Sequence, residues 1–365
     1  MTNEILIIGG ARPNFMKIAP LINELKQEKL DFKLIHTGQH YDYNMSKIFF
    51  DNLGIPKPDY FLNVGSGSHA IQTAKIMIEF EKVILKEKPK LVIVVGDVNS
   101  TIACALVAKK LFIEVAHIEA GLRSYDLTMP EEINRKLTDQ IADYLFITEK
   151  SALSNLKNEG IDSNKIFFVG NIMIDNLAKN MKSAQKNEYY KSLDLKSKSY
   201  GLITIHRPSN VDNIKDLKNV IEILEYIQTH IKIVFPVHPR TKESLKKFNL
   251  NEDINKPNII VTEPLGYLEF LNLMINAKFI LTDSGGIQEE ASYLNIPILT
   301  LRKNTERPIT IEKGTNTLVG NDFNDLKKCM NEILSNSYKK GQSIEKWDGK
   351  TSQRIIKVIR DKIIL

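Results

Sequence analysis

Residues 5–35 of the chain read ILIIGGARPNFMKIAPLINELKQEKLDFKLI, and this stretch decides the fold class. Ile5–Ile8 is a short apolar run that predicts a strand buried on both faces. Asn14–Lys29 carries apolar residues at spacings of three and four, which predicts an amphipathic helix. A second apolar run, Phe32–Ile35, follows it. Strand, helix and strand in this order form a βαβ unit with parallel strands, so we expect an α/β fold.

The same alternation continues along the chain in two series, separated by a polar stretch. The further predicted strands are Leu91–Val95, Ile113–Ala116, Tyr144–Ile147, Ile166–Val169, Gly201–Ile205, Lys232–Pro236, Ile259–Thr262, Phe279–Leu281 and Ile298–Leu301. The stretch KSAQKNEYYKSLDLKSKS lies between the series and indicates a domain boundary. We expect two doubly wound domains, 1–171 and 172–365. Ligands of such sheets bind beyond the carboxyl ends of the strands, so we expect a cleft between the domains.

Composition excludes several classes of protein. Apolar residues make up 42% and charged residues 26% of the 365 residues, an ordinary mix for a globular protein. The net charge of +6 is too small for a protein that coats nucleic acid. The N-terminus shows no signal-peptide pattern, and no apolar run is long enough to span a membrane. Two distant cysteines, Cys104 and Cys329, suit a reducing compartment. We therefore expect a cytoplasmic protein without nucleic-acid or membrane partners.

Three carboxylates follow predicted strands or open a predicted helix in the first half. Asp97 follows the run Leu91–Val95, Glu119 follows Ile113–Ala116, and Glu131 lies in the segment PEEINR. Carboxylates gathered at one sheet edge raise one another's pKa values, which suits proton transfer near neutral pH. A helix-capping role for Asp97 and compensation of the helix dipole by Glu131 explain the same residues without chemistry, so both interpretations stay open.

The pair His117 and Glu119 also raises the question of a metal site. The two residues are spaced like the HxE of zinc deaminases, but the PCxxC partner motif of those enzymes is absent. Neither cysteine has a histidine at ligand spacing. We expect no metal.

Loops of both halves carry groups suited to an anion. The turn GGARPN at 9–14 places Arg12 at the start of a helix, where free amides attract phosphate, although a plain turn explains it equally well. In the second half, His206 and His238 follow predicted strands. The segment TDSGGIQEEA at 282–291 is the strongest signal, because a strand feeds a Ser-Gly-Gly turn that opens a helix. Its candidate nucleotide contacts are Ser284, Gly285, Gly286 and Glu290, with Arg307 on a later loop.

Ten motifs together resemble the non-hydrolysing UDP-N-acetylglucosamine 2-epimerases over about residues 4–357. In chain order they are GGARPNFMKIAPL, HTGQHYDYNM, VVGDVNST, AHIEAGLRS, MPEEINR, TIHRPSNVDN, PVHPRT, TDSGGIQEEA, NTERP and WDGKTSQRI. The resemblance implies a GT-B-like fold, a homodimer, and a last helix within Ser352–Ile363 that returns to the first domain. It implies elimination of UDP to a 2-acetamidoglucal and re-addition from the other face, with no NAD, metal or other cofactor.

The resemblance also assigns roles to individual residues. Acid–base chemistry is assigned to Asp97, Glu119 and Glu131, and stabilisation of the leaving diphosphate to His206 and Arg12. Orientation of sugar and diphosphate is assigned to Lys17 and Arg135. UDP binding is assigned to Ser284, Gly285, Gly286 and Glu290, with Arg307 beside the sugar. His238 either contacts the ligand or is structural.

The sequence departs from the family pattern in two places, and one alternative substrate and three alternative functions are open. HRPSN at 206–210 replaces the HRRE-N of many bacterial members, and HTGQHYDYNM lacks a second glutamine found in the regulated enzymes. Both segments lie where those enzymes hold an activating substrate, which leaves regulation open. A modified sugar such as UDP-2,3-diacetamido-glucuronate is an alternative substrate. A GT-B glycosyltransferase, a non-catalytic UDP-sugar sensor and a hydrolysing epimerase are the alternative functions. The resemblance to the non-hydrolysing epimerases implies interconversion of UDP-GlcNAc and UDP-ManNAc for the synthesis of cell-surface polysaccharide precursors.

Overall fold

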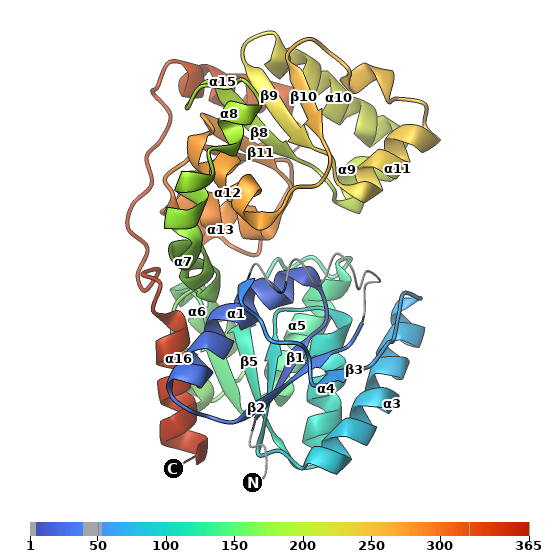
Figure 1. The fold of residues 1–365 in the computed structure, drawn as a ribbon, viewed down its shortest axis with the longest axis vertical. Coiled ribbons are helices and arrows are strands. Elements are labelled where there is room, and N and C mark those ends of the chain that lie inside the picture. The colour runs from blue at the N-terminus through green and yellow to red at the C-terminus, as the bar shows by residue number, and fades with distance from the viewer. Residues whose placement is uncertain (1–4, 39–49, 51–52, 321, 365) are drawn as a thin grey trace. The chain divides into compact units, whose positions relative to one another are not determined.

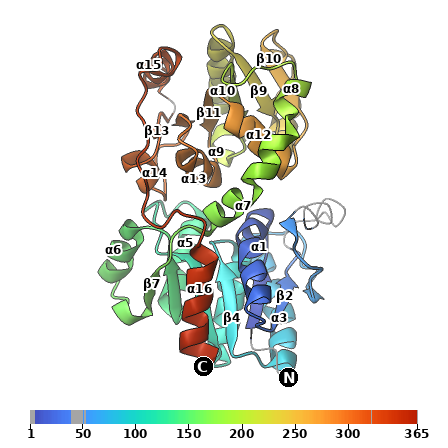
Figure 2. The same cartoon turned by 60° about the vertical axis from the view of Figure 1, so that its left-hand side comes forward.

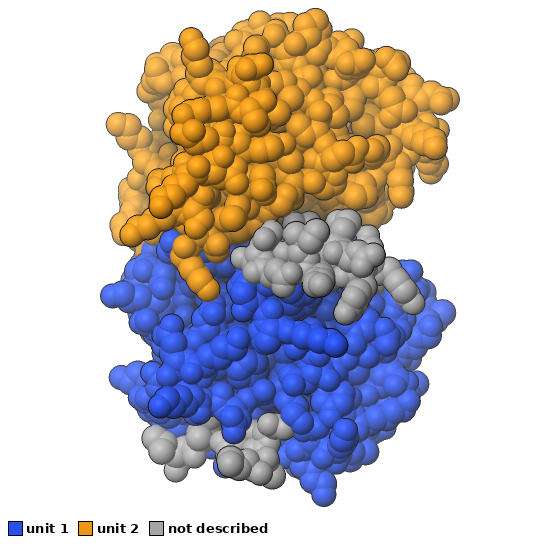
Figure 3. Space-filling model, viewed as in Figure 1, with its two compact units in different colours: residues 1–178, 345–365 blue, residues 179–344 orange. Residues whose placement is uncertain are grey.

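The computed structural model describes residues 5–38, 50, 53–320 and 322–364, and the chain forms two compact units (Figures 1 and 3). Unit 1 contains residues 1–178 and 345–365, and unit 2 contains residues 179–344. The division falls after Ala178, inside a helix, rather than between residues 171 and 172. The last 21 residues belong to unit 1, which agrees with the expected return of the last helix to the first domain, although the boundary at residue 171 counted them with the second.

Unit 1 is built around a seven-stranded sheet in which every pairing is parallel. The strand order is β3-β2-β1-β4-β5-β6-β7. The strands are β1 (Ile5–Gly9), β2 (Phe32–His36), β3 (Tyr60–Phe61), β4 (Leu91–Val95), β5 (Glu114–Ala120), β6 (Tyr144–Ile147) and β7 (Ile166–Phe168). The order reverses between β1 and β4, so their following loops diverge there and leave room for a ligand.

Helices connect or flank these strands. They are α1 (Arg12–Gln27), α3 (His69–Glu87), α4 (Asn99–Lys110), α5 (Pro130–Ile141), α6 (Lys150–Asn158), α7 (Ile172–Asn187) and α16 (Thr351–Ile359), with the short turns η1 (Ser163–Lys165) and η3 (Arg360–Ile364). Helix α16 lies beside α1 in both ribbon views (Figures 1 and 2). Asp175 of α7 accepts hydrogen bonds from the amides of Thr351 and Ser352, at 3.0 and 2.7 Å, and so caps the start of α16.

Unit 2 contains a six-stranded parallel sheet in the order β10-β9-β8-β11-β12-β13. Its strands are β8 (Tyr200–Thr204), β9 (Lys232–Pro236), β10 (Ile259–Thr262), β11 (Phe279–Thr282), β12 (Ile298–Thr300) and β13 (Asn316–Leu318). Its helices are α8 (Tyr189–Ser192), α9 (Pro208–Val211), α10 (Ile214–Gln228), α11 (Pro239–Lys247), η2 (Glu252–Ile254), α12 (Tyr267–Asn276), α13 (Gly285–Tyr293), α14 (Ile309–Glu312) and α15 (Phe323–Leu334). The order reverses between β8 and β11, which marks the corresponding ligand position.

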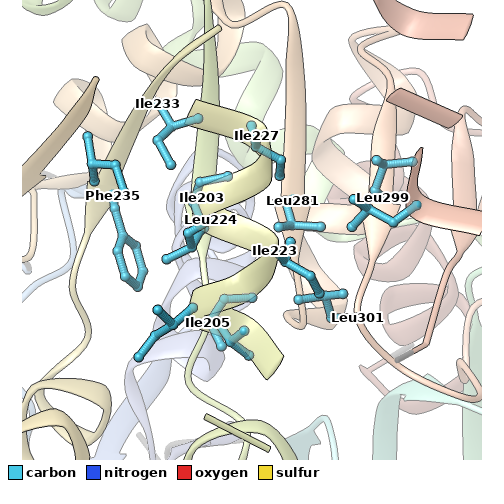
Figure 4. Packing of buried hydrophobic residues seen from close by; sticks show 14 of the residues in the cluster. Ile203, Ile205, Ile223, Leu224, Ile227, Ile233, Phe235, Leu281, Leu299 and Leu301 are labelled. Carbon is cyan, nitrogen blue, oxygen red and sulfur yellow. The ribbon is translucent and has the colours of Figure 1, made fainter. Parts of the chain in front are cut away.

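The core of unit 2 forms between its sheet and helices. Ile203 and Leu281, from the two central strands, pack with Ile223, Leu224 and Ile227 of α10 in one buried cluster (Figure 4). Because these strands are buried on both faces, they read as continuous apolar runs, which is why the sequence located them. Of the helices among the described residues, none is both long and apolar enough to cross a membrane.

Candidate active site

Glu119 lies near the end of β5, where the pairing with β6 is interrupted. The register shifts between Ile118 and Ala120, so Glu119 sits in a bulge. Its φ of 74° lies in the left-handed region, which a non-glycine residue seldom adopts. The buried carboxylate forms an ion pair with Nζ of Lys17 from α1. Backbone strain of this kind concentrates at functional sites, and here it aims a charged group at a buried partner.

Asp97 lies in the loop after β4, beside that ion pair. Gly96 turns the chain with a φ of 70°, and Nη2 of Arg135 from α5 donates to Oδ2 of Asp97 at 2.5 Å. A β-carbon on Gly96 would lie 3.5 Å from Nζ of Lys17. The Glu119–Lys17 pair and the Asp97–Arg135 pair are therefore neighbours at the point where the strand order reverses.

Helix α5 supplies two adjacent glutamates with different environments. Glu131, the residue singled out from the sequence, is half-buried in the first turn and forms no hydrogen bond or ion pair with another described residue. Glu132 is fully buried and accepts hydrogen bonds from the amides of Ser124 and Tyr125, both at 3.0 Å. It also pairs with Arg135. Glu132 therefore holds the loop after β5 and orients the arginine that contacts Asp97, whereas the side chain of Glu131 stays half-exposed in the first turn of α5.

The turn after β1 does not present free amides to an anion. Oδ1 of Asn14 accepts hydrogen bonds from the amides of Gly10, at 3.2 Å, and Ala11, at 2.9 Å. The Asn14 amide nitrogen donates to the carbonyl of Val95 at 3.0 Å, which ties this turn to β4. The plain structural turn, one of the two open interpretations, fits this geometry. The side chain of Arg12 lies outside the described part of the structure.

His117 forms part of a buried network rather than a metal site. Its Nδ1 lies 2.7 Å from Oδ1 of Asp139, and its Nε2 lies 2.7 Å from the carbonyl oxygen of Gly96. Both ring nitrogens are engaged, so His117 does not join Glu119 in binding a metal. Burial alone would raise the pKa of Asp139, but the hydrogen bond with His117 and the charge of Arg123 hold that pKa below its ordinary value.

In unit 2, the Ser-Gly-Gly turn forms the start of α13. Ser284 is the N-cap residue, and Gly285 and Gly286 occupy the first turn, whose amides have no partner within the helix. A β-carbon on Gly285 would lie only 2.5 Å from Nη1 of Arg307, so the guanidinium lies directly over the turn. Arg307 pairs with Glu289, at 2.8 Å, and with Glu306, whose Oε1 would also lie 2.8 Å from that β-carbon. The turn therefore combines amides at a helix start with an arginine that two carboxylates hold in place.

Glu290 lies on α13 and is buried. The hydroxyl of Tyr267 donates to Oε1 of Glu290 at 2.8 Å. Burial raises the pKa of Glu290 to about 7; the Tyr267 hydrogen bond opposes this shift and the neighbouring charge of Glu289 adds to it. The carboxyl group is thus held in one orientation on the helix that the Ser-Gly-Gly turn begins.

His206 and His238 come together beyond β8 and β9. Their ring centroids are 5.1 Å apart. His206 is about one-third exposed, and its Nδ1 lies 3.1 Å from Oδ1 of the buried Asp283. His238 is exposed, and its Nδ1 accepts a hydrogen bond from the amide of Arg240 at 3.2 Å, which makes His238 the N-cap residue of α11. His206 therefore lies at the point where the strand order reverses, between β8 and β11, and His238 borders it.

A family model described as UDP-N-acetylglucosamine 2-epimerase matches residues 23–360. The chain belongs to this family. It is 50% identical, over 98% of both chains, to a protein of Methanocaldococcus jannaschii named UDP-N-acetylglucosamine 2-epimerase. It is 44% identical, over 87% of this chain and 88% of the other, to the UDP-2,3-diacetamido-2,3-dideoxy-D-glucuronate 2-epimerase of Pseudomonas aeruginosa.

Solved structures of epimerase family members share the fold. The crystal structure of the M. jannaschii UDP-GlcNAc 2-epimerase in complex with UDP-GlcNAc and UDP matches with a TM-score of 0.91 and 48% identity, over 98% of this chain and 99% of that one. A Staphylococcus aureus relative solved with UDP matches with a TM-score of 0.88 and 34% identity, over 99% and 97%. The family resemblance and the GT-B-like α/β fold expected from the sequence are therefore confirmed.

Several residues that organise this epimerase-family site carry no distinct sequence signal. Glu132 is one of two consecutive glutamates, and nothing in the sequence says which of them turns inward. Asp139 lies inside α5, where a charged residue is typical of a solvent-exposed face, and Asp283 follows β11, where an aspartate is typical of a turn or a cap. Tyr267 lies in the apolar helix α12, where an aromatic residue reads as core. For Asp283 the available signal was its position directly before the Ser-Gly-Gly turn.

Proposed function

We propose that the protein is a non-hydrolysing UDP-N-acetylglucosamine 2-epimerase, an isomerase that interconverts UDP-GlcNAc and UDP-ManNAc. The observation that carries the proposal is the pair of neighbouring ion pairs Lys17–Glu119, which is buried, and Asp97–Arg135, whose aspartate is partly exposed, at the reversal point of one sheet. A carboxylate can remove a proton, and a flanking cation holds that carboxylate in one orientation. Family membership supports the same assignment.

The proposed reaction is an elimination followed by a re-addition. A carboxylate removes the proton at carbon 2 while the bond from carbon 1 to the UDP oxygen breaks, which leaves 2-acetamidoglucal and UDP. A proton is then returned to carbon 2 from the other face, and the UDP oxygen re-forms its bond to carbon 1. Atoms and electrons balance without an external oxidant. We assign the proton transfers to Asp97, Glu119 and Glu131, with Lys17 and Arg135 orienting the groups.

Unit 2 is proposed to hold the UDP part of the substrate. The open amides at Gly285 and Gly286 and the guanidinium of Arg307 suit the diphosphate. The carboxyl group of Glu290 suits the ribose hydroxyls. His206 is proposed to donate a hydrogen bond to the departing diphosphate, which develops charge as the glycosidic bond breaks. Ser284, Arg12 and His238 complete the proposed binding set.

Proton NMR in heavy water tests the reaction. Purified enzyme with UDP-GlcNAc and no acceptor is expected to form UDP-ManNAc that carries deuterium at carbon 2. Epimerisation without deuterium would contradict elimination and proton return. Turnover only after addition of an acceptor would support a GT-B glycosyltransferase, and release of free N-acetylmannosamine would support a hydrolysing epimerase.

A second candidate substrate is UDP-2,3-diacetamido-glucuronate. It is favoured by the relative from P. aeruginosa, whose name states this substrate and which is 44% identical to the chain. The M. jannaschii relative, 50% identical over almost the whole chain, favours UDP-GlcNAc. Comparing kcat/KM for the two UDP-sugars decides between them, and a ratio above ten in favour of the glucuronate would replace the first proposal.

We also propose that the protein forms a homodimer through helices α3 and α5. Ile71, Ile78 and Leu85 recur every seven residues on α3, and each is more than half exposed. Ile133 and Leu137, one turn apart on α5, are exposed as well. A seven-residue apolar repeat on an exposed helix is typical of a helix that packs against another helix. A second copy of this chain would cover the stripe.

Light scattering tests the dimer. The wild-type protein is expected to have the mass of two chains, and Ile78→Asp the mass of one. Ile214→Asp is the matched control, because Ile214 is a similarly exposed isoleucine on α10 of unit 2. A dimer that survives Ile78→Asp would place the interface elsewhere.

We further propose that the enzyme acts in the cytoplasm and supplies a precursor of cell-surface polysaccharide.

A further inference from the structure

Asp283 connects the two parts of the proposed UDP site in unit 2. It follows β11 directly, precedes Ser284 and is fully buried. Its carboxylate accepts hydrogen bonds from the amides of His206, at 3.0 Å, and Arg207, at 2.8 Å, and from the side chain of Asn210, at 2.9 Å. One carboxylate thus holds the loop after β8 against the end of β11.

The same carboxylate also faces the imidazole ring of His206. Nδ1 of His206 lies 3.1 Å from Oδ1 of Asp283, while Nε2 has no hydrogen-bond partner among the described residues. Among the described residues, the other titratable side chain that packs against this ring is His238, and the two ring centroids are 5.1 Å apart. Burial would raise the pKa of Asp283, but the His206 interactions and the donors on the loop hold the pKa below its ordinary value.

We propose that Asp283 is a positioning residue for the epimerisation: it holds the Nδ1 side of His206 so that Nε2 is presented to the diphosphate of the substrate. This inference rests on the proposed function. A carboxylate that accepts the Nδ1 proton fixes the tautomer and orientation of an imidazole and stabilises its positively charged form. That form is a hydrogen-bond donor at Nε2, which is what a departing diphosphate requires. Because Asp283 also precedes Ser284, the end of one strand positions both the histidine and the diphosphate turn.

Kinetics of four variants test the proposal. Asp283→Asn is expected to lower kcat about tenfold or more. A positioned acid or base accelerates a reaction by a factor of about 10²–10⁴, and a histidine that is no longer held in position loses part of this factor. Its KM and its affinity for UDP in calorimetry are expected to change little. In a His206→Gln background the same substitution is expected to have almost no further effect on kcat, because the partner through which it acts is gone.

Asn210→Ser is the matched control. It removes one donor to the same carboxylate and leaves the imidazole in place, so it is expected to lower kcat far less than Asp283→Asn. Equal losses in the two variants would mean that Asp283 only anchors the loop, and multiplicative losses in Asp283→Asn/His206→Gln would mean that it acts independently of His206. Either result would overturn the proposal.

Nitrogen-15 NMR of the histidine rings gives a readout that needs no turnover. In the wild-type protein with UDP bound, His206 is expected to carry protons on both Nδ1 and Nε2, and this signature is expected to change in Asp283→Asn. Absence of the Nδ1 proton in the wild-type protein would overturn the proposal even if Asp283→Asn did not fold. If the wild-type protein showed no epimerase activity, the proposed function would be wrong. This outcome is distinct from the ones that would overturn the role of Asp283.

Discussion

The ammonium group of Lys17 and the carboxylate of Glu119 form an ion pair in which both side chains are less than a tenth exposed. Lys17 comes from the first turns of α1, and Glu119 comes from the bulged end of β5. Two charges that are buried together stabilise each other only as a pair, because neither can recover its hydration. The same two residues that we assign to the reaction therefore also affect the stability of unit 1.

Lys17→Met is expected to destabilise unit 1 by about 3–5 kcal/mol, because it removes the cation that neutralises a buried carboxylate. Lys17→Met/Glu119→Gln is expected to recover much of that loss, since no charge is then buried alone. Urea denaturation followed by circular dichroism measures both. A double variant no more stable than Lys17→Met would mean that the pair is not the source of the loss.

The three carboxylates are expected to matter for turnover and not for holding UDP. Asp97→Asn, Glu119→Gln and Glu131→Gln should each lower kcat by about 100-fold or more, in line with the roughly 10²–10⁴ that a positioned acid or base contributes. UDP affinity should weaken far less. Initial rates and calorimetric titration measure the two effects. Variants that lose UDP affinity and keep their turnover would contradict the proposed division of roles.

Glu290→Ala is expected to show the opposite pattern. Loss of the acceptor for ribose hydroxyls should weaken UDP binding by roughly 1–3 kcal/mol, because a buried hydroxyl would be left without a partner. Tyr267→Phe is the control: it removes the donor to Glu290 and leaves the carboxyl group in place. It should weaken UDP binding less, as calorimetry will measure. A larger loss in Tyr267→Phe than in Glu290→Ala would mean that the tyrosine, and not the glutamate, meets the ribose.

The raised pKa of Glu290 makes stability depend on pH in one direction. With a pKa of about 7 when folded and an ordinary value of 4.5, the folded protein retains a proton here that the unfolded chain releases between those pH values. The contribution of this group to the free energy of unfolding is therefore greatest below pH 4.5 and is lost as the pH rises through 7. Glu290→Gln cannot ionise, and its stability relative to the wild-type protein should rise by roughly 3 kcal/mol across this window.

Urea unfolding of both proteins without UDP, at pH 5 and pH 8, measures that difference. The glutamine retains an acceptor for the Tyr267 hydroxyl, so the comparison isolates the charge. A relative stability that does not change between the two pH values would show that Glu290 titrates near its ordinary value.

The sequence predicted the strands well where each is buried on both faces. The run Leu91–Val95 coincides with β4, whereas β3 has only two residues and β13 reads Asn-Thr-Leu, so neither forms an apolar run. At the site, the sequence located Asp97 and Glu119 by their place after strands. It could not separate Glu131 from Glu132, because adjacent helical residues point about 100° apart and the pattern does not fix which one turns inward.

The return of residues 345–365 to unit 1 has a consequence for how the chain matures. Unit 2 is one uninterrupted segment, so it can close its core while it leaves the ribosome. Unit 1 must wait, because Asp175 of α7 caps a helix that is synthesised after the whole of unit 2. Until residues 351–359 have been made, α1 exposes the face that α16 will cover. A truncation before residue 351 would therefore damage the unit whose synthesis began first.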